Sequence, residues 1–281
     1  MRFSNWVKRI IAISFACFGL EIRKKGEWQR MSMRSVLRHA KRIGFSPATL
    51  VDAGAAFGDW TACAHSVFPD ARYVLIEPLT EYRPVLEAVC QSLKSSRLIS
   101  GAAAGPDTSQ IAINVHKDLV GSSIFEEVED EETLVQEKRV VPAYTLDDLC
   151  ADELPPFLLK LDLQGAELEA LRGGKRTLAR TDMVILEVSF FRAIRTAPLF
   201  HEVTAFMKDT GFVAYDIAGI SYRPLDGALC QADVAFVRET GIFRISDAYA
   251  APEQRERQNA KFVRERRRRL ACIGDGHNQT E

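Results

Sequence analysis

Short apolar segments with the length of β-strands alternate with amphipathic helical segments through most of this chain. Strand patterns cover residues 48–54, 72–78, 97–105, 156–165, 182–190 and 212–219, and a last strand follows a turn at Asp226 and Gly227. Helical patterns lie between them at 60–68, 81–93, 166–179 and 201–211. Strands joined through helices form a parallel sheet with helices on both faces. The sequence therefore predicts an α/β, doubly wound, mostly parallel sheet.

Two pieces interrupt this alternation. Residues 109–118 predict an extra strand without a helix of its own, and the acidic stretch 126–132 predicts a solvated turn, with an exposed loop beside the site as the alternative. We expect three parts: an N-terminal helical extension (1–45), one ligand-binding domain (46–245) and a basic C-terminal tail (246–281), which contains "RERRRRL".

The composition and net charge indicate which kinds of binding partner to expect. Of the 281 residues, 47% are hydrophobic and 27% are charged, which is typical of a globular protein, and the net charge of -1 gives no general attraction to nucleic acid. Six cysteines without a C-x-x-C pair indicate reduced thiols, so we expect a cytoplasmic protein. The apolar run at 10–20 is shorter than the ~20 residues that span a bilayer. It predicts a packed helix, while a membrane-surface helix and an export signal stay open.

The stretch "LVDAGAAFGDW", residues 50–60, lies where the first buried strand turns into its helix. Ligands of doubly wound sheets bind at this place, beyond the carboxyl ends of the strands. The small residues Gly54, Ala55 and Gly58 let a ligand approach the main chain. Glu77, followed by Pro78, ends the second strand, where a carboxylate accepts hydrogen bonds from the hydroxyls of a ribose. The pattern predicts a ligand that contains a nucleoside.

The type of nucleoside follows from the charges. In the dinucleotide motif G-x-G-x-x-G, with Gly54 first, the second and third glycines are replaced by Ala56 and Asp59, and Asp59 would repel a pyrophosphate. S-adenosylmethionine carries positive groups and no phosphate. Asp52 can face its amino group, Glu77 its ribose, and the backbone at Ala103 its adenine. The sequence predicts S-adenosylmethionine as the cofactor.

Several motifs together resemble those of the FkbM-type methyltransferases. The matching segments are "VDAGAAFGDWT", "YVLIEP", "VPAYTLDDL", "LLKLDLQGAELEALRGG", "VILEVSF" and "QADVAFVRE". The resemblance implies a Rossmann-like, seven-stranded sheet of the class I methyltransferase type with an antiparallel last strand. It also implies methyl transfer from S-adenosylmethionine to a hydroxyl of a sugar, glycan or secondary metabolite. Many relatives have Glu where Gln164 stands.

The catalytic candidates are Asp162 and Lys160. Asp162 follows the fourth strand, where it can accept the proton of an acceptor hydroxyl. Lys160 lies two residues earlier on the same face and can favour the charged form of Asp162. Asp162 as a helix N-cap, Glu167 as an acid in the first turn of a helix, and Glu187 and His116 beside the acceptor are further hypotheses. No residues stand at metal-ligand spacing, so we expect no metal.

Two other functions stay open. One is a nicotinamide-dependent oxidoreductase, which the two missing glycines disfavour. The other is a nucleoside-binding module without catalysis, because Asp52 and Glu77 alone would serve binding. The sequence does not encode the acceptor or the oligomeric state in any readable motif.

Overall fold

The computed structural model describes residues 31–128 and 135–276. The hypotheses on the apolar N-terminal run and on most of the acidic stretch therefore concern residues outside the described part of the chain. The chain divides into two compact units, residues 1–243 and 244–281. The second unit contains helix α10 (Pro252–Gly276), in which eight Arg and Lys residues stand against three Glu residues between 252 and 270.

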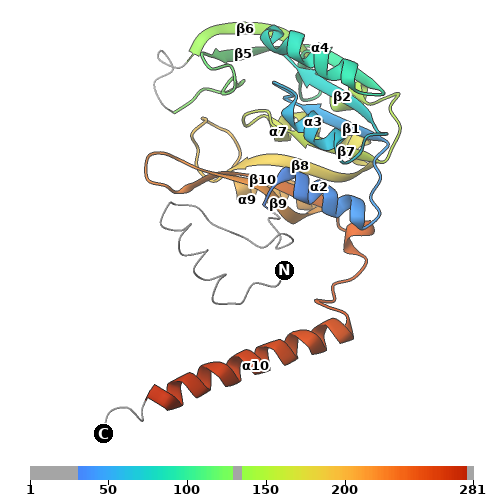
Figure 1. The fold of residues 1–281 in the computed structure, drawn as a ribbon. Helices are drawn as coiled ribbons and strands as arrows, with labels where there is room; N and C mark the ends of the chain where they lie inside the picture. Colours follow the sequence, from blue (N-terminus) through green and yellow to red (C-terminus); the bar gives the residue numbers. More distant parts are fainter. Residues whose placement is uncertain (1–30, 129–134, 277–281) are drawn as a thin grey trace. The chain divides into compact units, whose positions relative to one another are not determined.

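The first unit is built on a seven-stranded sheet with the order β3-β2-β1-β7-β8-β10-β9 (Figure 1). Strand β10 is antiparallel to both β8 and β9, and the other neighbouring strands are parallel. This confirms the predicted mostly parallel sheet with an antiparallel last strand. The strands of this sheet are β1 (Thr49–Ala53), β2 (Arg72–Glu77), β3 (Ser96–Ser100), β7 (Phe157–Leu161), β8 (Thr181–Ser189), β9 (Phe212–Tyr222) and β10 (Leu229–Arg238).

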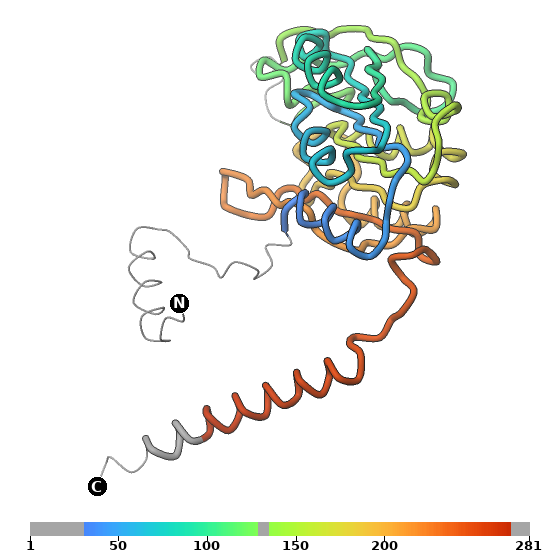
Figure 2. The backbone as a smooth tube through the Cα atoms, turned by 45° about the vertical axis from the view of Figure 1, so that its right-hand side comes forward, coloured from blue at the N-terminus to red at the C-terminus, as the bar shows by residue number. Residues whose placement is uncertain are grey.

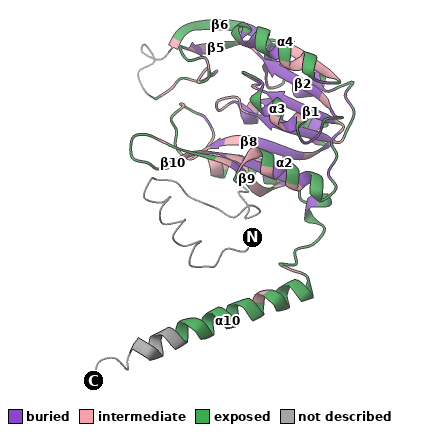
Figure 3. Cartoon of the chain, in the orientation of Figure 1, coloured by how far each residue is buried: buried purple, intermediate pink, exposed green. Residues whose placement is uncertain are grey.

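Helices cover both faces of the sheet because its central strands are apolar on both sides (Figure 3). One core layer packs under α2 (Met33–Arg42), α3 (Asp59–His65) and α4 (Arg83–Ser92). The other packs under α6 (Leu146–Leu149), α7 (Glu167–Arg172), α8 (Lys175–Leu178) and α9 (Phe200–Asp209). Helix α2 lies in the segment that we expected as an extension, and its Val36, Leu37 and Ala40 are part of the first layer.

The segment between β3 and β7 forms a second, three-stranded sheet with the order β4-β6-β5. It consists of β4 (Ala102–Ala103), β5 (Gln110–His116) and β6 (Val135–Tyr144), and its strand β4 contacts β2 of the large sheet (Figures 1 and 2). Strand β5 is the predicted extra strand, whereas β6 was not predicted. The expected third strand breaks at Gly101, where a Cβ would lie 2.6 Å from the ring of Tyr144. The chain therefore leaves the large sheet at this point.

The remaining elements are two 3-10 turns, η1 (Thr80–Tyr82) and η2 (Ile242–Arg244). The helix expected over 166–179 is split into α7 and α8 at Gly173 and Gly174. A Cβ at Gly173 would lie 2.3 Å from the carbonyl oxygen of Ala104, so this close approach replaces a helical turn. No helix in the described ranges has the length and apolar character needed to cross a membrane. Cys63, Cys90, Cys150 and Cys230 are free thiols.

Candidate functional site

A cleft opens at the carboxyl ends of β1, β2 and β7, where a doubly wound sheet binds its ligand. Four of the seven predicted cofactor residues line it, namely Gly54, Glu77, Pro78 and Ala103. The catalytic candidate Asp162 lies in the same lining. The other lining residues come mostly from the turn after β2, the loop after β5 and the loop after β7: Ala56, Ile76, Leu79, Tyr82, Ala102, Ile113, Leu119, Val120, Ser122, Ser123, Ile124, Leu163, Gln164 and Ala166.

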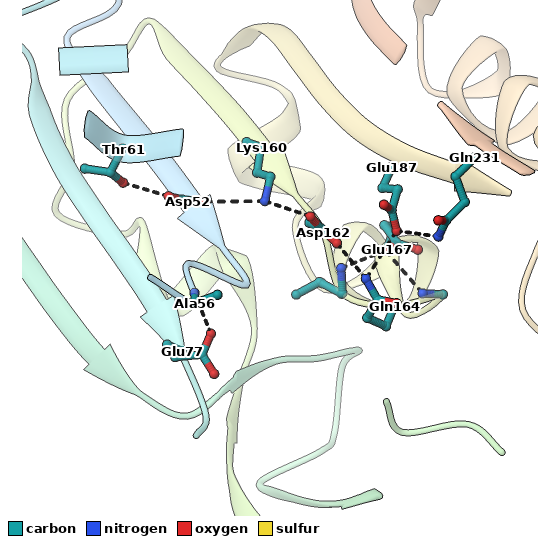
Figure 4. Close-up of polar contacts among 12 residues, drawn as sticks. Asp52, Ala56, Thr61, Glu77, Lys160, Asp162, Gln164, Glu167, Glu187 and Gln231 are labelled. Atoms are coloured by element: carbon teal, nitrogen blue, oxygen red, sulfur yellow. Dashed lines mark hydrogen bonds and ion pairs between the residues drawn. The ribbon is translucent and has the colours of Figure 1, made fainter. Parts of the chain in front are cut away.

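Glu77 is fixed by the backbone of two neighbouring turns. Its Oε2 accepts a hydrogen bond from the amide of Ala56 at 2.9 Å (Figure 4), and its Oε1 accepts one from the amide of Leu79 at 2.9 Å. The side chain is almost fully buried, and burial raises its pKa although both amides act in the opposite direction. Each carboxylate oxygen can accept a second hydrogen bond. Glu77 is therefore a preorganised acceptor for a ligand hydroxyl.

The glycines of the turn after β1 allow other parts of the protein to pack closely against the main chain. Gly54 has φ +77°, and a Cβ there would lie 1.9 Å from the carbonyl oxygen of Asp162. Gly58 has φ +78° at the start of α3, and a Cβ there would lie 3.0 Å from Val89. Ala55 and Gly58 do not line the cleft. Gly54 thus brings the tips of β1 and β7 together and shapes the cleft between them.

A buried cation lies between two acidic side chains at this edge of the sheet. Lys160 Nζ is 3.2 Å from Asp162 Oδ2 and 3.8 Å from Asp52 Oδ1 (Figure 4). Burial acts to lower the pKa of Lys160, but the two carboxylates outweigh it and the pKa is raised. Lys160 does not line the cleft, so it acts on a ligand through Asp162. Its pairing with Asp162 agrees with the arrangement that the sequence suggested.

Asp52 is fully buried and lies behind the cleft lining. Its Oδ2 accepts a hydrogen bond from the hydroxyl of Thr61 at 2.7 Å, while Oδ1 has no hydrogen-bond partner among the described residues. Burial raises the pKa of Asp52, opposed by Lys160 and Thr61. One oxygen of Asp52 therefore has no hydrogen-bond donor among the described residues, and its predicted contact with a ligand amino group stays a prediction.

Asp52, Lys160 and Asp162 form a row of polar side chains, and this row continues from Asp162 to side chains of β8 and β10. Gln164 Nε2 lies 3.0 Å from Asp162 Oδ1 and 3.2 Å from Glu187 Oε2, so one amide bridges two carboxyl groups. Gln231 Nε2 donates to the same oxygen of Glu187 at 2.9 Å (Figure 4). Burial, reinforced by nearby acidic groups such as Asp162, raises the pKa of Glu187 to about 9. The charged form of Glu187 is therefore disfavoured.

Glu167 organises the loop that carries Asp162 and Gln164. As the sequence suggested, it lies in the first turn of α7, but it is buried, and its Oε1 accepts hydrogen bonds from the amides of Leu163 at 2.7 Å and Gly165 at 3.3 Å. Burial raises its pKa to about 7. Ala166 occupies the N-cap position, so Asp162 does not cap α7.

Other side chains lie differently from what the sequence suggested. His116 Nδ1 contacts Asp118 at 2.7 Å and does not line the cleft. The hydroxyl of Tyr82, in contrast, is buried, lines the cleft and has no partner among the described residues. Sequence reasoning missed Tyr82 and the loop after β5, although an aromatic residue five positions after Glu77 was a signal for the former. Within the described ranges, no three His, Cys, Asp or Glu side chains form a metal site.

The fold and the cleft together define the class of protein. A sheet of order 3-2-1-7-8-10-9, in which the antiparallel strand β10 lies between β8 and β9, and an acid at the tip of β2 are the arrangement of a class I methyltransferase. Residues 52–214, more than half of the chain, match the family model described as "Methyltransferase FkbM domain". The chain therefore belongs to the FkbM methyltransferase family, which confirms the resemblance and S-adenosylmethionine as the methyl donor of this family.

Solved structures with related folds were also found. An FkbM methyltransferase from Methylobacillus flagellatus is 16% identical with a TM-score of 0.44, and the match covers 72% of this chain and 48% of that one. The chain thus spans about half the length of that protein. A precorrin-6y C5,15-methyltransferase from Geobacter metallireducens is 12% identical over 73% and 87% of the two chains, with a TM-score of 0.41. No curated protein matches the sequence.

A third structure is a 1,6-didemethyltoxoflavin-N1-methyltransferase from Burkholderia thailandensis, which contains 1,6-didemethyltoxoflavin and S-adenosylhomocysteine. It is 10% identical over 85% of this chain and 91% of that one, with a TM-score of 0.39. The family assignment rests on the family model and not on these structures.

The first prediction concerns the close contact at Gly54. We expect Gly54→Ala to lower the free energy of unfolding by about 3 kcal/mol or more, because the new Cβ meets the Asp162 carbonyl. Gly211→Ala is the matched control, since Gly211 also has a positive φ but has no atom within 4 Å of the new Cβ; it should cost about 1 kcal/mol. Urea unfolding measures both values. Equal losses would show that the contact is not the constraint.

The second prediction concerns the pH dependence of stability through Glu167. Its pKa rises from 4.5 in the unfolded chain to about 7 in the folded protein, so its stabilising effect is complete below pH 4.5 and is lost as the pH rises through 7. Glu167→Gln should therefore become more stable relative to wild type by up to roughly 3 kcal/mol between pH 4.5 and 8. Urea unfolding at several pH values, with Glu169→Gln as a surface control, tests this. A difference that does not change with pH contradicts it.

Proposed function

We propose that the protein is an S-adenosylmethionine-dependent O-methyltransferase that acts on a hydroxyl group of a small molecule or glycan. The observation that supports this most directly is the charge of the cleft. The charged side chains among its described lining residues are Glu77 and Asp162, and no Lys, Arg or His is among them. This lining favours a ligand with positive groups and disfavours the pyrophosphate of a nicotinamide dinucleotide.

Two buried polar atoms without hydrogen-bond partners also support S-adenosylmethionine as the ligand. Asp52 Oδ1 and the hydroxyl of Tyr82 are buried without hydrogen-bond partners among the described residues. Buried polar groups are nearly always hydrogen-bonded, so a bound ligand or water is expected to complete them. Glu77 and Tyr82 line the cleft, whereas Asp52 lies behind its lining and can hold a ligand amino group through a water molecule.

The reaction needs a base at the tip of β7. When bound, S-adenosylmethionine would supply a methyl group on a cationic sulfur, which would leave with the electron pair of the broken carbon–sulfur bond as the acceptor oxygen bonds to the methyl carbon. Asp162 takes the proton that the hydroxyl loses. Its carboxyl is 30% exposed, in contrast to Asp52, and Lys160 at 3.2 Å compensates its charge. The rest of the acceleration comes from holding the two reactants in line.

The free thiols of the described residues support a reducing compartment, and we include a cytoplasmic location in the proposal. A nicotinamide oxidoreductase is disfavoured by the acidic lining. A binding module without catalysis would not need an exposed carboxylate such as Asp162 beside the cleft.

The third prediction tests the cofactor cleft. Isothermal titration should give micromolar binding of S-adenosylhomocysteine and none of NAD, and Glu77→Ala should abolish the binding. Tyr82→Phe should weaken it roughly 3- to 10-fold without lowering the stability of the free protein, because the hydroxyl that is removed has no partner in that state. Absence of binding to the wild type would overturn the proposed function. Unchanged affinity in Tyr82→Phe would remove Tyr82 from the site.

The fourth prediction tests the base. Asp162→Asn should lower methyl transfer by about 100-fold or more while S-adenosylhomocysteine binds as in wild type. Transfer of ¹³C-methyl label to the hydroxylated compounds of a cell extract, followed by NMR, measures the rate and shows whether the product is an ether. Asp209→Asn, an exposed change at the end of α9, is the control. Wild-type transfer in Asp162→Asn would exclude Asp162 as the base.

A further inference from the structure

A second hollow lies on the side of Glu187 away from the cofactor cleft. Residues of three neighbouring strands line it: Glu187 of β8, Gly219, Ile220 and Ser221 of β9, and Gln231, Ala232 and Asp233 of β10. The antiparallel register places Asp233 opposite both Glu187 and Gly219. Residues opposite one another share a face of the sheet, so the two carboxyl groups lie on the same side. The hollow is therefore a feature built by the sheet itself.

One amide separates this hollow from the cofactor cleft. Gln164 lines the cleft beside Asp162, and its Nε2 lies 3.2 Å from Glu187 Oε2, in the lining of the hollow (Figure 4). The hollow thus borders the end of the cleft where Asp162 lies. Glu77 does not line the hollow, so a molecule held there leaves Glu77 free for another ligand.

A glycine makes room for one of the carboxyl groups. A Cβ at Gly219 would lie 2.4 Å from Asp233 Oδ2. The backbone of Gly219 has no positive φ, so its conformation does not require glycine. The absent side chain leaves space above β9, and the carboxyl group of Asp233 extends into it.

Two acceptor groups of the hollow, the carboxyl group of Asp233 and Glu187 Oε1, lack donors. In the described part of the chain, no residue donates a hydrogen bond to Asp233 or to Glu187 Oε1, and no cationic side chain forms an ion pair with either residue. The nearby Lys160 is paired with Asp162 and Asp52. Half-buried acceptor atoms without donors gain free energy from a ligand that brings N–H or O–H groups.

We propose that this hollow is the acceptor subsite, and that it binds an uncharged or cationic group rich in hydrogen-bond donors, such as a polyol or amino sugar, while it rejects acidic groups. The inference rests on the proposed function, because an acceptor has to reach Asp162. A phosphate or carboxylate in the hollow would meet Asp233 without a compensating cation. A hydroxyl or ammonium group supplies the missing donors.

The test uses three hexoses that differ in one charged group: glucosamine, glucose and glucuronate. Saturation-transfer NMR titrations at pH 7 are made on the full chain saturated with S-adenosylhomocysteine. In the wild type, glucosamine and glucose should bind, and glucuronate should bind at least roughly tenfold more weakly. Asp233→Asn should weaken glucosamine about tenfold and remove the discrimination against glucuronate. Its affinity for S-adenosylhomocysteine should remain that of the wild type.

Two further variants make the result specific. Gly219→Ala fills the space beside Asp233 without changing charge, so all three hexoses should lose affinity. Asp182→Asn, at the other end of β8 and outside the hollow, should behave as wild type. Binding of the hexoses that is unaltered in both Asp233→Asn and Gly219→Ala would overturn the inference. So would equal binding of glucuronate to the wild type, or binding of S-adenosylhomocysteine without any hexose. A wild type that fails to bind S-adenosylhomocysteine overturns the proposed function itself.

Discussion

The buried ammonium of Lys160 is the interaction on which the site depends. It lies between Asp52 of β1 and Asp162 at the tip of β7, at 3.8 Å and 3.2 Å, while Asp52 accepts a hydrogen bond from Thr61 of α3. A buried charge without partners would cost several kcal/mol, so the cation and its two carboxylates need one another. The contact fixes α3, the two central strands and Asp162 relative to one another. It thereby determines where Asp162 can meet a ligand.

The cofactor end of the site is largely encoded in local sequence. A buried strand ends near Asp52 and the next ends at Glu77, and parallel strands bring their carboxyl ends to one edge, so both acids could be placed from their spacing. The same reasoning gave Asp162 and its pairing with Lys160. The small residues of the first turn were expected to let a ligand approach the main chain. At Gly54 the close group is instead the carbonyl of Asp162, which is 108 residues away in the chain, so no local pattern indicates its approach.

The rest of the site depends on tertiary contacts that a linear pattern does not show. Strand β6 pairs with β4 and β5, and many of its residues are exposed. Its pairing depends on the departure of the chain from the large sheet at Gly101, which no local sequence pattern indicates. The loop after β5 then reaches the cleft through Leu119 and Val120, which are unremarkable residues in the sequence. Tyr82 reads as a packed aromatic residue, and only its burial without a partner indicates a polar role.

The residue at position 164 links the two halves of the site. As an amide, Gln164 lies within hydrogen-bond distance of both Asp162 and Glu187, and Gln231 donates to Glu187 from the other side. Donors and acceptors thus alternate from Lys160 to Gln231. A glutamate at this position would place a third carboxyl group between the two, where it could donate only in its protonated form. With glutamine there, and with burial raising the pKa of Glu187, the charged form of Glu187 is disfavoured, and Asp162 is the carboxyl of this row that faces the cleft beside a compensating cation.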